Sequence, residues 1–223
     1  MNPPAPESPA PTPEEQAVVD EVLDTYSQGW FPMGEGGKVD WVRPEKRGLI
    51  PLDDRFGISK SLAKVVRSGR FIIKSDTAFS QVIRACAKSA PGREQTWLHP
   101  AIVRAFGLLH RVGKAHSVEA WLVDKRGAEV LVGGLYGLAI GGAFFGESMF
   151  SRPLLGGTDA SKVCLVRLVN RLRADGYDLL DAQIWNAHLA QFGCYEVDDG
   201  RYMEMLGSAI TNSPGCWARG VMS

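Results

Sequence analysis

The spacing of apolar residues changes near residue 117, and this change restricts the fold more than any other feature of the sequence. From there to residue 150, apolar residues alternate with polar or small ones in three runs: Ser117–Asp124, Glu129–Leu138 and Ala143–Phe150. A period of two is typical of β-strands. Two glycine-containing turns, Lys125–Gly127 and Gly141–Gly142, separate the runs. We therefore predict a three-stranded antiparallel meander.

Helices are predicted on both sides of this meander. Helical spacing runs from Glu14 to Gly29, over 59–69, 77–88 and 100–112, and over Ala160–Ala174, which Gly176 closes. A strand over Tyr177–Trp185 and a last helix over Asn186–Phe192 are expected to follow, whereas residues 31–41 are interpreted as a short irregular segment.

This order of elements predicts an α+β fold whose core is an acyltransferase (N-acetyltransferase-like) domain with an antiparallel meander plus helices. We expect the catalytic domain to span residues 58–223 and a small N-terminal domain to span residues 14–57. Residues 1–13 contain six prolines, which predicts a disordered leader.

Composition excludes several classes of protein. No window approaches the roughly 18 consecutive apolar residues of a membrane span. The first residues lack the basic and apolar regions of a secretory signal, so a cytoplasmic location is expected. The four cysteines (86, 164, 194 and 216) form no CxxC pair and no HExxH motif is present, which predicts neither a metal nor a disulfide framework. The four histidines are given structural roles.

Charge is distributed unevenly although the formal net charge is zero. Residues 1–42 hold eight acids against one lysine, and residues 43–74 hold nine bases against three acids. Lys60, Lys64 and Arg67 share one face of the predicted helix 59–69. Such a face fits either a polyanion-binding surface or an ordinary solvated surface.

Asp181 and Gln183 lie two residues apart on the predicted strand, so their side chains are expected to project from one face within hydrogen-bonding reach. Buried polar groups need partners. The pair is therefore either a structural network or a device in which Asp181 orients the Gln183 amide. In the second case, the amide oxygen would accept a hydrogen bond from an incoming amine, because glutamine is no useful base.

Glu147 is the one carboxylate in an otherwise apolar strand, and its neighbour Gly146 suggests a β-bulge or a close approach of a ligand. An apolar pocket is expected beside it, formed with Leu135, Tyr136 and Phe144. Glu147 would either attract a cationic ligand group or pair with an internal Arg or Lys.

Covalent and cofactor chemistry receive little support from the sequence. GESMFS (146–151) lacks the GxSxG arrangement of a serine nucleophile. RPLLGG (152–157) has an arginine and two glycines, but not in the register of a CoA pyrophosphate loop. We therefore expect neither an acyl-enzyme nor a bound cofactor.

Many ordered segments between Tyr26 and Gly193 are similar to those of leucyl/phenylalanyl-tRNA–protein transferases. They are YSQGWFPM (26–33), WVRPEKR (41–47), TW (96–97), LH (109–110), HSVEAW (116–121), LVGGLYG (131–137), FFGESMFS (144–151), ASK (160–162), LLDAQ (179–183) with Asn186, His188 and Leu189, and FG (192–193). The segments follow one another in the family's order over most of the chain.

The resemblance implies transfer of leucine or phenylalanine, less often methionine, from aminoacyl-tRNA to the N-terminal amine of proteins that begin with Arg or Lys. The product would be an N-degron that the protein-degradation machinery reads. It implies partners that are charged tRNA and such acceptor proteins, and neither DNA nor a membrane.

The same resemblance implies roles for individual residues. Asp181 and Gln183 would guide the attacking α-amine, and Glu147 would place the cationic acceptor. The side-chain pocket would be formed by Leu135, Tyr136, Phe144 and Phe145, and tRNA would be bound by Trp97, Trp41, Lys60, Lys64 and Arg67. Stacking of a base on an aromatic ring contributes about 1–3 kcal/mol.

The sequence also departs from the family's pattern. Met33 replaces a tryptophan associated with the terminal adenosine, so the stacking platform would either differ or depend on Trp41. Ala182 replaces a cysteine, and residues 152–159 form a longer, glycine-rich segment. The alternatives kept open are a CoA-dependent N-acyltransferase and a non-catalytic module that binds tRNA or peptide.

Overall fold

The computed structural model describes residues 10–88 and 97–222, and it confirms a mixed α+β fold. The helices are α1 (Pro13–Ser27), α2 (Lys60–Arg67), α3 (Phe79–Cys86), α4 (Pro100–Arg111), α5 (Ala160–Asp175), α6 (Ala187–Ala190) and α7 (Asp199–Thr211), with a 3₁₀ turn η1 (Pro153–Leu155). The strands are β1 (Phe31–Glu35), β2 (Lys38–Val42), β3 (Lys46–Ile50), β4 (Ile72–Ser75), β5 (Ala115–Val123), β6 (Glu129–Ile140), β7 (Ala143–Ser151), β8 (Leu179–Asp181), β9 (Tyr195–Asp198) and β10 (Gly220–Val221).

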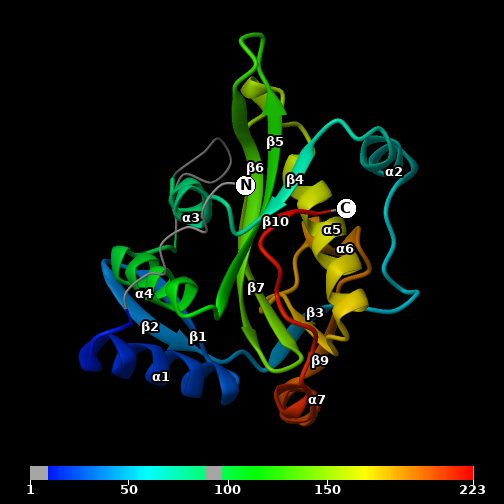
Figure 1. Cartoon of the computed structure of the whole chain (residues 1–223). Helices are drawn as coiled ribbons and strands as arrows, with labels where there is room; N and C mark the ends of the chain where they lie inside the picture. The colour runs from blue at the N-terminus through cyan, green and yellow to red at the C-terminus, as the bar shows by residue number, and fades with distance from the viewer. Residues whose placement is uncertain (1–9, 89–96, 223) are drawn as a thin grey trace.

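Eight strands form one sheet in the order β10-β4-β5-β6-β7-β8-β3-β9, with β5, β6 and β7 at its centre (Figure 1). These three strands pair antiparallel, which confirms the predicted meander. Strand β8 pairs with β7 in parallel through only three residue pairs, the last of which is Phe145 with Asp181. Beyond that pair β7 continues and β8 ends, so the sheet divides there.

Helices cover both faces of this sheet. One core packs α1, α3, α4 and α7 against residues such as Tyr136 and Phe145. The other packs α2 and α5 against residues such as Leu135 and Phe144. Neighbouring strand residues alternate between these cores, as the pleat of a strand requires. Within residues 10–88 and 97–222 no helix is long and apolar enough to cross a membrane.

Several sequence predictions need correction. Residues 31–42 are a β-hairpin rather than an irregular segment, because β1 and β2 pair around the turn at Gly36–Gly37. The strand expected over Tyr177–Trp185 stops at Asp181. The helix over 186–192 is short, and the longer helix α7 follows it. Of the leader predicted over residues 1–13, residues 1–9 lie outside the described part of the chain, and Pro13 already belongs to α1.

The first helix illustrates how the local sequence sets an element's start. Thr12 is the N-cap of α1, and its hydroxyl accepts a hydrogen bond from the Glu15 backbone N–H. The Glu15 carboxylate in turn accepts one from the Thr12 backbone N–H at 2.9 Å, which completes a capping box. The helix thereby begins at a fixed residue, and its buried Tyr26 is held beside β7, 5.1 Å from the Phe145 ring.

Candidate active site

The candidate site lies where β7 and β8 separate. Gly146 follows the last pair of the two strands, and a Cβ atom there would approach the Asp181 carbonyl oxygen to 3.5 Å. One residue later, the pairing of β7 with β6 shifts register: Tyr136 faces Ser148 and Gly137 faces Gly146. Glu147 is therefore the extra residue of a β-bulge, as its glycine neighbour suggested.

The bulge directs the partly buried Glu147 side chain toward α1 and toward the end of β8. Its Oε1 atom accepts hydrogen bonds from the Tyr26 hydroxyl at 2.9 Å and from the Gln183 side-chain amide at 3.3 Å. Burial raises the pKa of Glu147 to about 8, although the bond from Tyr26 opposes this shift. The described residues form no ion pair with Glu147, so the alternative of an internal Arg or Lys partner finds no support among them.

Asp181 lies at the end of β8 and is completely buried with a charged partner. Arg47 of β3 donates from Nη2 to Asp181 Oδ2 at 2.7 Å and from Nε to Oδ1 at 2.9 Å. The Tyr202 hydroxyl donates to Oδ2 at 2.6 Å. The guanidinium lies between the Phe31 and Tyr202 rings and also donates to the Gly29 carbonyl at 2.8 Å. Removing one partner of such a pair costs about 3–5 kcal/mol.

Gln183 adopts a left-handed backbone conformation, with φ of 58°. A residue other than glycine rarely takes this conformation without support from its surroundings. Here the support comes from Asp181, because the Gln183 backbone N–H donates to Asp181 Oδ1 at 2.7 Å. Gly48 of β3 also approaches closely: its N–H donates to the Gln183 carbonyl at 2.9 Å, and a Cβ atom on Gly48 would meet Trp185 N at 2.7 Å.

These contacts correct the expected relation between the two residues. The Asp181 carboxylate holds the Gln183 backbone and not its side-chain amide. The two side chains do not project side by side from one regular strand, because β8 ends before Gln183. The Gln183 amide instead reaches Glu147, and both residues line the apolar pocket, which the completely buried Asp181 also borders.

An apolar pocket of about 230 Å³ opens beside Glu147. The predicted residues Leu135 and Tyr136 line it, together with Met149, Leu165, Leu168 and Leu180. Phe144 and Phe145 do not line this pocket. Both are fully buried on opposite sides of β7: Phe145 packs against Tyr26, and Phe144 stacks on Trp217. Helix α5 supplies the wall that the sequence analysis assigned to these phenylalanines.

A second hollow of about 170 Å³ adjoins the first. Phe31, Pro32 and Met33 of the hairpin line it, together with Trp97 and Ile184. The two hollows share the wall made by Glu147, Ala182, Gln183 and Asn186. Trp97 thus lines the same hollow as Glu147, and its contact with tRNA stays a prediction. Trp41 lies elsewhere: it packs edge-on against Tyr26 at 6.2 Å and lines a separate apolar groove between α1 and α4.

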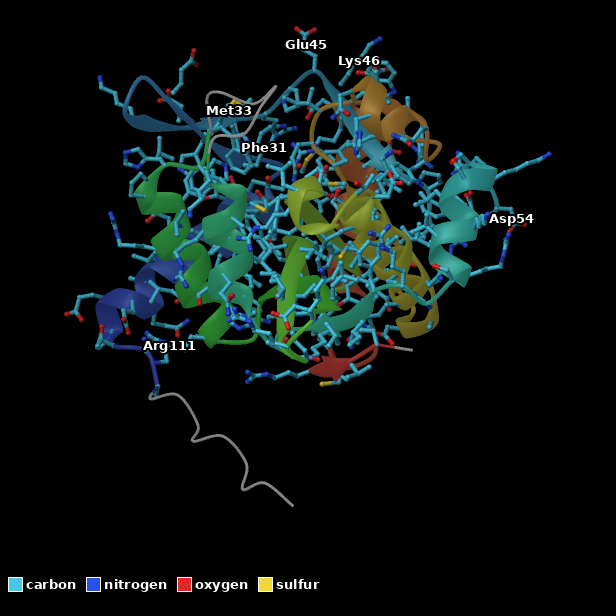
Figure 2. The ribbon with its side chains drawn as sticks, turned by 90° about the horizontal axis from the view of Figure 1, so that it is seen from above. Phe31, Met33, Glu45, Lys46, Asp54 and Arg111 are labelled. Atoms are coloured by element: carbon cyan, nitrogen blue, oxygen red, sulfur yellow. The ribbon has the colours of Figure 1, made fainter. Side chains whose placement is uncertain are left out.

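The hairpin and α2 occupy different sides of the molecule. Figure 2 shows Phe31 and Met33 on the hairpin, away from Asp54, which lies beside α2. Lys60, Lys64 and Arg67 are exposed on α2. Not every base of residues 43–74 is available to a ligand, because Arg47 is buried and Arg43 and Arg55 pair with Asp199 and Asp53. The basic surface is therefore smaller than the sequence predicted.

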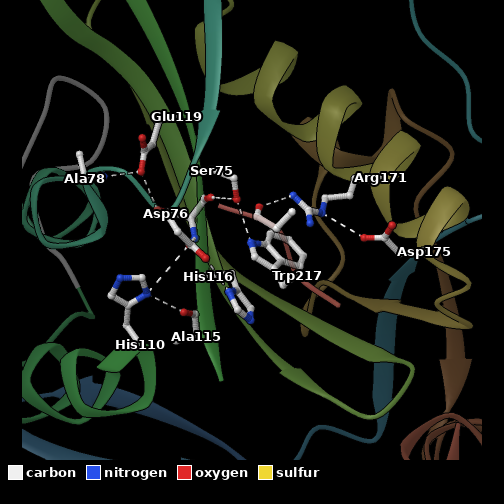
Figure 3. Close-up of polar contacts among 12 residues, drawn as sticks. Ser75, Asp76, Ala78, His110, Ala115, His116, Glu119, Arg171, Asp175 and Trp217 are labelled. Atoms are coloured by element: carbon white, nitrogen blue, oxygen red, sulfur yellow. Dashed lines mark hydrogen bonds and ion pairs between the residues drawn. The ribbon is translucent and has the colours of Figure 1, made fainter. Parts of the chain in front are cut away.

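The described residues contain no group of three or more His, Cys, Asp or Glu side chains placed to hold a metal ion. His99 caps α4 through Nδ1, which accepts from the Ala101 N–H at 3.2 Å. His110 and His116 contact the Ala115 carbonyl and Asp76, in a polar cluster at the start of β5 (Figure 3). Strand β6 separates this cluster from the Glu147 bulge of β7. His188 lies at the rim of the apolar pocket.

Three residues that shape the site, Tyr26, Arg47 and Tyr202, were not predicted from the sequence. Each is at most 1% exposed. Of the three, Arg47 could have been noticed in the sequence, because this charged residue directly precedes the apolar run Gly48–Ile50. Nothing in the local sequence of Tyr202 identifies its partner. The contact depends on α7 packing near the end of β8, 21 residues away in the sequence.

The chain is similar to known proteins in both sequence and fold. The profile of the family described as leucyl/phenylalanyl-tRNA protein transferase matches residues 49–207. Two proteins called leucyl/phenylalanyl-tRNA–protein transferase, from Caulobacter vibrioides strains NA1000/CB15N and ATCC 19089/CIP 103742/CB 15, are each 48% identical over 201 residues, covering 89% of this chain and 88% of their own. The crystal structure of FemX shares the fold with a TM-score of 0.56 at 9% identity, covering 80% of this chain and 66% of that one.

Proposed function

Since the chain belongs to the leucyl/phenylalanyl-tRNA–protein transferase family, we propose that it transfers leucine or phenylalanine, and less often methionine, to proteins that begin with Arg or Lys. Family membership makes it an enzyme that moves an aminoacyl group from tRNA to a protein. The choice of donor and acceptor is the proposal. The product would be an N-degron, made in the cytoplasm, that marks the acceptor for degradation.

One observation carries this proposal: two hollows meet at a wall made by Glu147 and Gln183. An aminoacyl-adenosine has an apolar side chain and a nucleoside joined at an ester. The apolar pocket fits the side chain, and the second hollow, with Trp97 and Met33, fits the adenosine. The ester carbonyl would then lie at the shared wall, where an acceptor amine meets the Glu147 carboxyl and the Gln183 amide.

The reaction requires little more from the protein than this arrangement. Aminolysis of an ester is downhill, so the enzyme mainly has to hold two substrates in a reactive arrangement and move one proton. Glu147 supplies the counter-charge for a cationic acceptor, and the Gln183 amide oxygen accepts from the incoming amine. Asp181 and Arg47 act from beneath by fixing the Gln183 backbone.

The size of the apolar pocket determines which amino acid the enzyme accepts from tRNA. Unbranched Met149 and five leucines line it, a mixture that can adjust to either leucine or phenylalanine. Such a pocket separates substrates by about 1–3 kcal/mol per methylene group. The acceptor stem of the tRNA is proposed to lie along α2, with contacts from Lys60, Lys64 and Arg67 to phosphates rather than to bases.

We propose two units within the chain: a small N-terminal unit over residues 14–57 and an acyltransferase-like catalytic unit over 58–223. The β1–β2 hairpin forms a sheet of its own, but β3 belongs to the large sheet. The N-terminal unit therefore contributes both the hairpin that borders the second hollow and Arg47 beneath Asp181.

Incubation with labelled leucyl-tRNA, phenylalanyl-tRNA and acetyl-CoA, each with a matrix of peptides differing in the first residue, tests the proposal. We expect label from the first two donors on peptides that begin with Arg or Lys. Matched peptides with a blocked α-amine should stay unlabelled. Labelling from acetyl-CoA instead would support the alternative N-acyltransferase. Labelling of peptides that begin with Asp or Glu would overturn the acceptor assignment.

A further inference from the structure

We propose that Glu147 is itself a catalytic residue, whose Oε2 atom takes a proton from the α-ammonium group of the acceptor before the amine attacks the ester. This inference rests on the proposed function and extends it. In that function Glu147 supplies only a negative charge, whereas here it removes a proton. The two roles predict different responses to pH.

The geometry leaves one carboxylate oxygen of Glu147 available. Both hydrogen bonds that the side chain accepts, from Tyr26 and from Gln183, fall on Oε1. Oε2 has no hydrogen-bond partner among residues 10–88 and 97–222. Because Glu147 lines both hollows, an amine placed at the ester carbonyl meets this side chain. Tyr26 and Gln183 hold the carboxylate in place without using its second oxygen.

The groups packed around Glu147 make it a suitable base. They are Tyr26 from α1, Tyr136 from β6, Arg47 from β3 and Asp181 from β8. Arg47 and Asp181 largely cancel each other, since they form a direct ion pair. Burial raises the pKa of Glu147 to about 8. An α-amino group has a pKa of about 7.7–8.0, so the proton moves between nearly matched groups.

The step balances as follows. The acceptor α-ammonium gives one proton to Glu147 Oε2 and becomes a neutral amine. Its nitrogen forms a bond to the ester carbonyl carbon, and the bond from that carbon to the ribose oxygen then breaks. The second amine proton goes to the departing ribose oxygen, which leaves as a hydroxyl. Glu147 holds the first proton until solvent removes it.

Glu147→Gln tests the proposal, because glutamine keeps the size of the side chain and an oxygen that accepts from Tyr26 but cannot take a proton. Single-turnover transfer from leucyl-tRNA to an Arg-initiated peptide should be measured from pH 6 to 9, corrected for ester hydrolysis. At pH 8, where about half of Glu147 is ionised and about half of the α-amine is still charged, we expect a loss of roughly 100-fold or more. At pH 9 most of the amine arrives already neutral, so the loss should shrink severalfold.

Tyr26→Phe provides a second variant that keeps the carboxylate. Removing a donor that favours the charged form should raise the pKa of Glu147 further. The acidic limb of the pH–rate profile should then move to higher pH. The same change made in the Glu147→Gln background should cause no shift. Tyr177→Phe, on the other side of the sheet, is the matched control and should leave the profile of the native protein unchanged.

The outcomes separate the two proposals. A loss in Glu147→Gln that is the same at every pH and confined to the acceptor KM would leave Glu147 a counter-charge and overturn this inference. An unshifted profile in Tyr26→Phe would also overturn it. Absence of transfer by the native protein from any charged tRNA would instead overturn the proposed function. Circular dichroism of each variant checks that the fold is intact.

Discussion

The sheet carries two buried carboxylate clusters, which differ in what they leave unpaired. In the first, Glu119 is fully buried and accepts from four donors: the Thr77 hydroxyl, the Ala78 N–H at 2.7 Å, the Ser117 hydroxyl at 2.8 Å and the Trp121 indole at 3.3 Å. Nearby, Asp76 binds the Ser117 N–H and His116 (Figure 3). Both oxygens of each carboxylate have partners, so this cluster has no capacity left for a ligand.

The second cluster is built in two levels. Asp181 is as fully paired as Glu119, through Arg47, Tyr202 and the Gln183 backbone. Above it, Glu147 keeps one oxygen unpaired beside two hollows. The comparison teaches that a buried carboxylate alone does not identify a site. The site lies where a fully paired carboxylate supports a second polar group that still has an oxygen without a hydrogen-bond partner.

The largest effect is expected for Arg47→Met. Methionine keeps an apolar stem between the Phe31 and Tyr202 rings but leaves Asp181 buried without its counter-charge. We expect a loss of about 3–5 kcal/mol in the free energy of unfolding, measured by urea denaturation. A loss below about 1 kcal/mol would show that Asp181 does not depend on Arg47.

Tyr202→Phe should have a smaller effect on stability and a clear effect on transfer. It removes one hydrogen bond to a buried charge, which corresponds to about 1.5–3 kcal/mol of unfolding free energy. Because Asp181 holds the Gln183 backbone, transfer per folded molecule should fall as well. Unfolding curves and single-turnover transfer should be measured on the same preparation. A change in stability with no change in transfer would contradict the link between Asp181 and the reaction.

Glu119→Ala is the matched variant in the other cluster. It leaves the N–H at the α3 N-terminus without its acceptor, and for that donor alone it should cost about 1–3 kcal/mol of unfolding free energy. Transfer per folded molecule should stay within about twofold of the native value at 25 °C, because Glu119 lines neither of the two hollows at the candidate site. A selective loss of transfer with unchanged stability would mean that the two clusters do not differ in the way described above.

The next prediction concerns a change with pH rather than a loss at one pH: the stability of Glu147→Gln. The pKa of Glu147 is raised from its ordinary value of 4.5 to about 8 in the folded protein. Between these values the unfolded chain binds fewer protons than the folded one, so native stability falls as pH rises. Glu147→Gln does not titrate. Its stability relative to the native protein should therefore increase from pH 5 to pH 8, and a constant difference in thermal denaturation would contradict this.

The meander and its flanking helices could be predicted because they depend on local periodicity. The end of strand β8 could not be predicted from the sequence. The strand ends at Asp181 because Gln183 takes a left-handed backbone conformation, which its hydrogen bond to Asp181 stabilises. Asp181 is in turn held by Arg47 of β3. The hairpin β1–β2 was missed although Gly36–Gly37 marks its turn, since strands of five residues give a weak pattern.

For the site, the resemblance and the lone carboxylate in β7 led to Glu147, Gln183 and Asp181, and the structure brings these together. Of the four residues predicted to form the side-chain pocket, Leu135 and Tyr136 line it, but Phe144 and Phe145 do not. Burial of Arg47 could not be predicted because its partner is 134 residues away in the sequence. Long-range pairing of charges leaves no local pattern.

Transfer by Gln183→Ala tests the central claim most directly, because Gln183 faces the shared wall while its backbone is held by Asp181. The measurement is single-turnover transfer of leucine from preloaded tRNA to an Arg-initiated peptide, alongside tRNA affinity. We predict that transfer falls at least tenfold while tRNA affinity stays within about twofold. Transfer at the native rate, or loss of transfer together with tRNA binding, would contradict the assignment of this wall as the reaction centre.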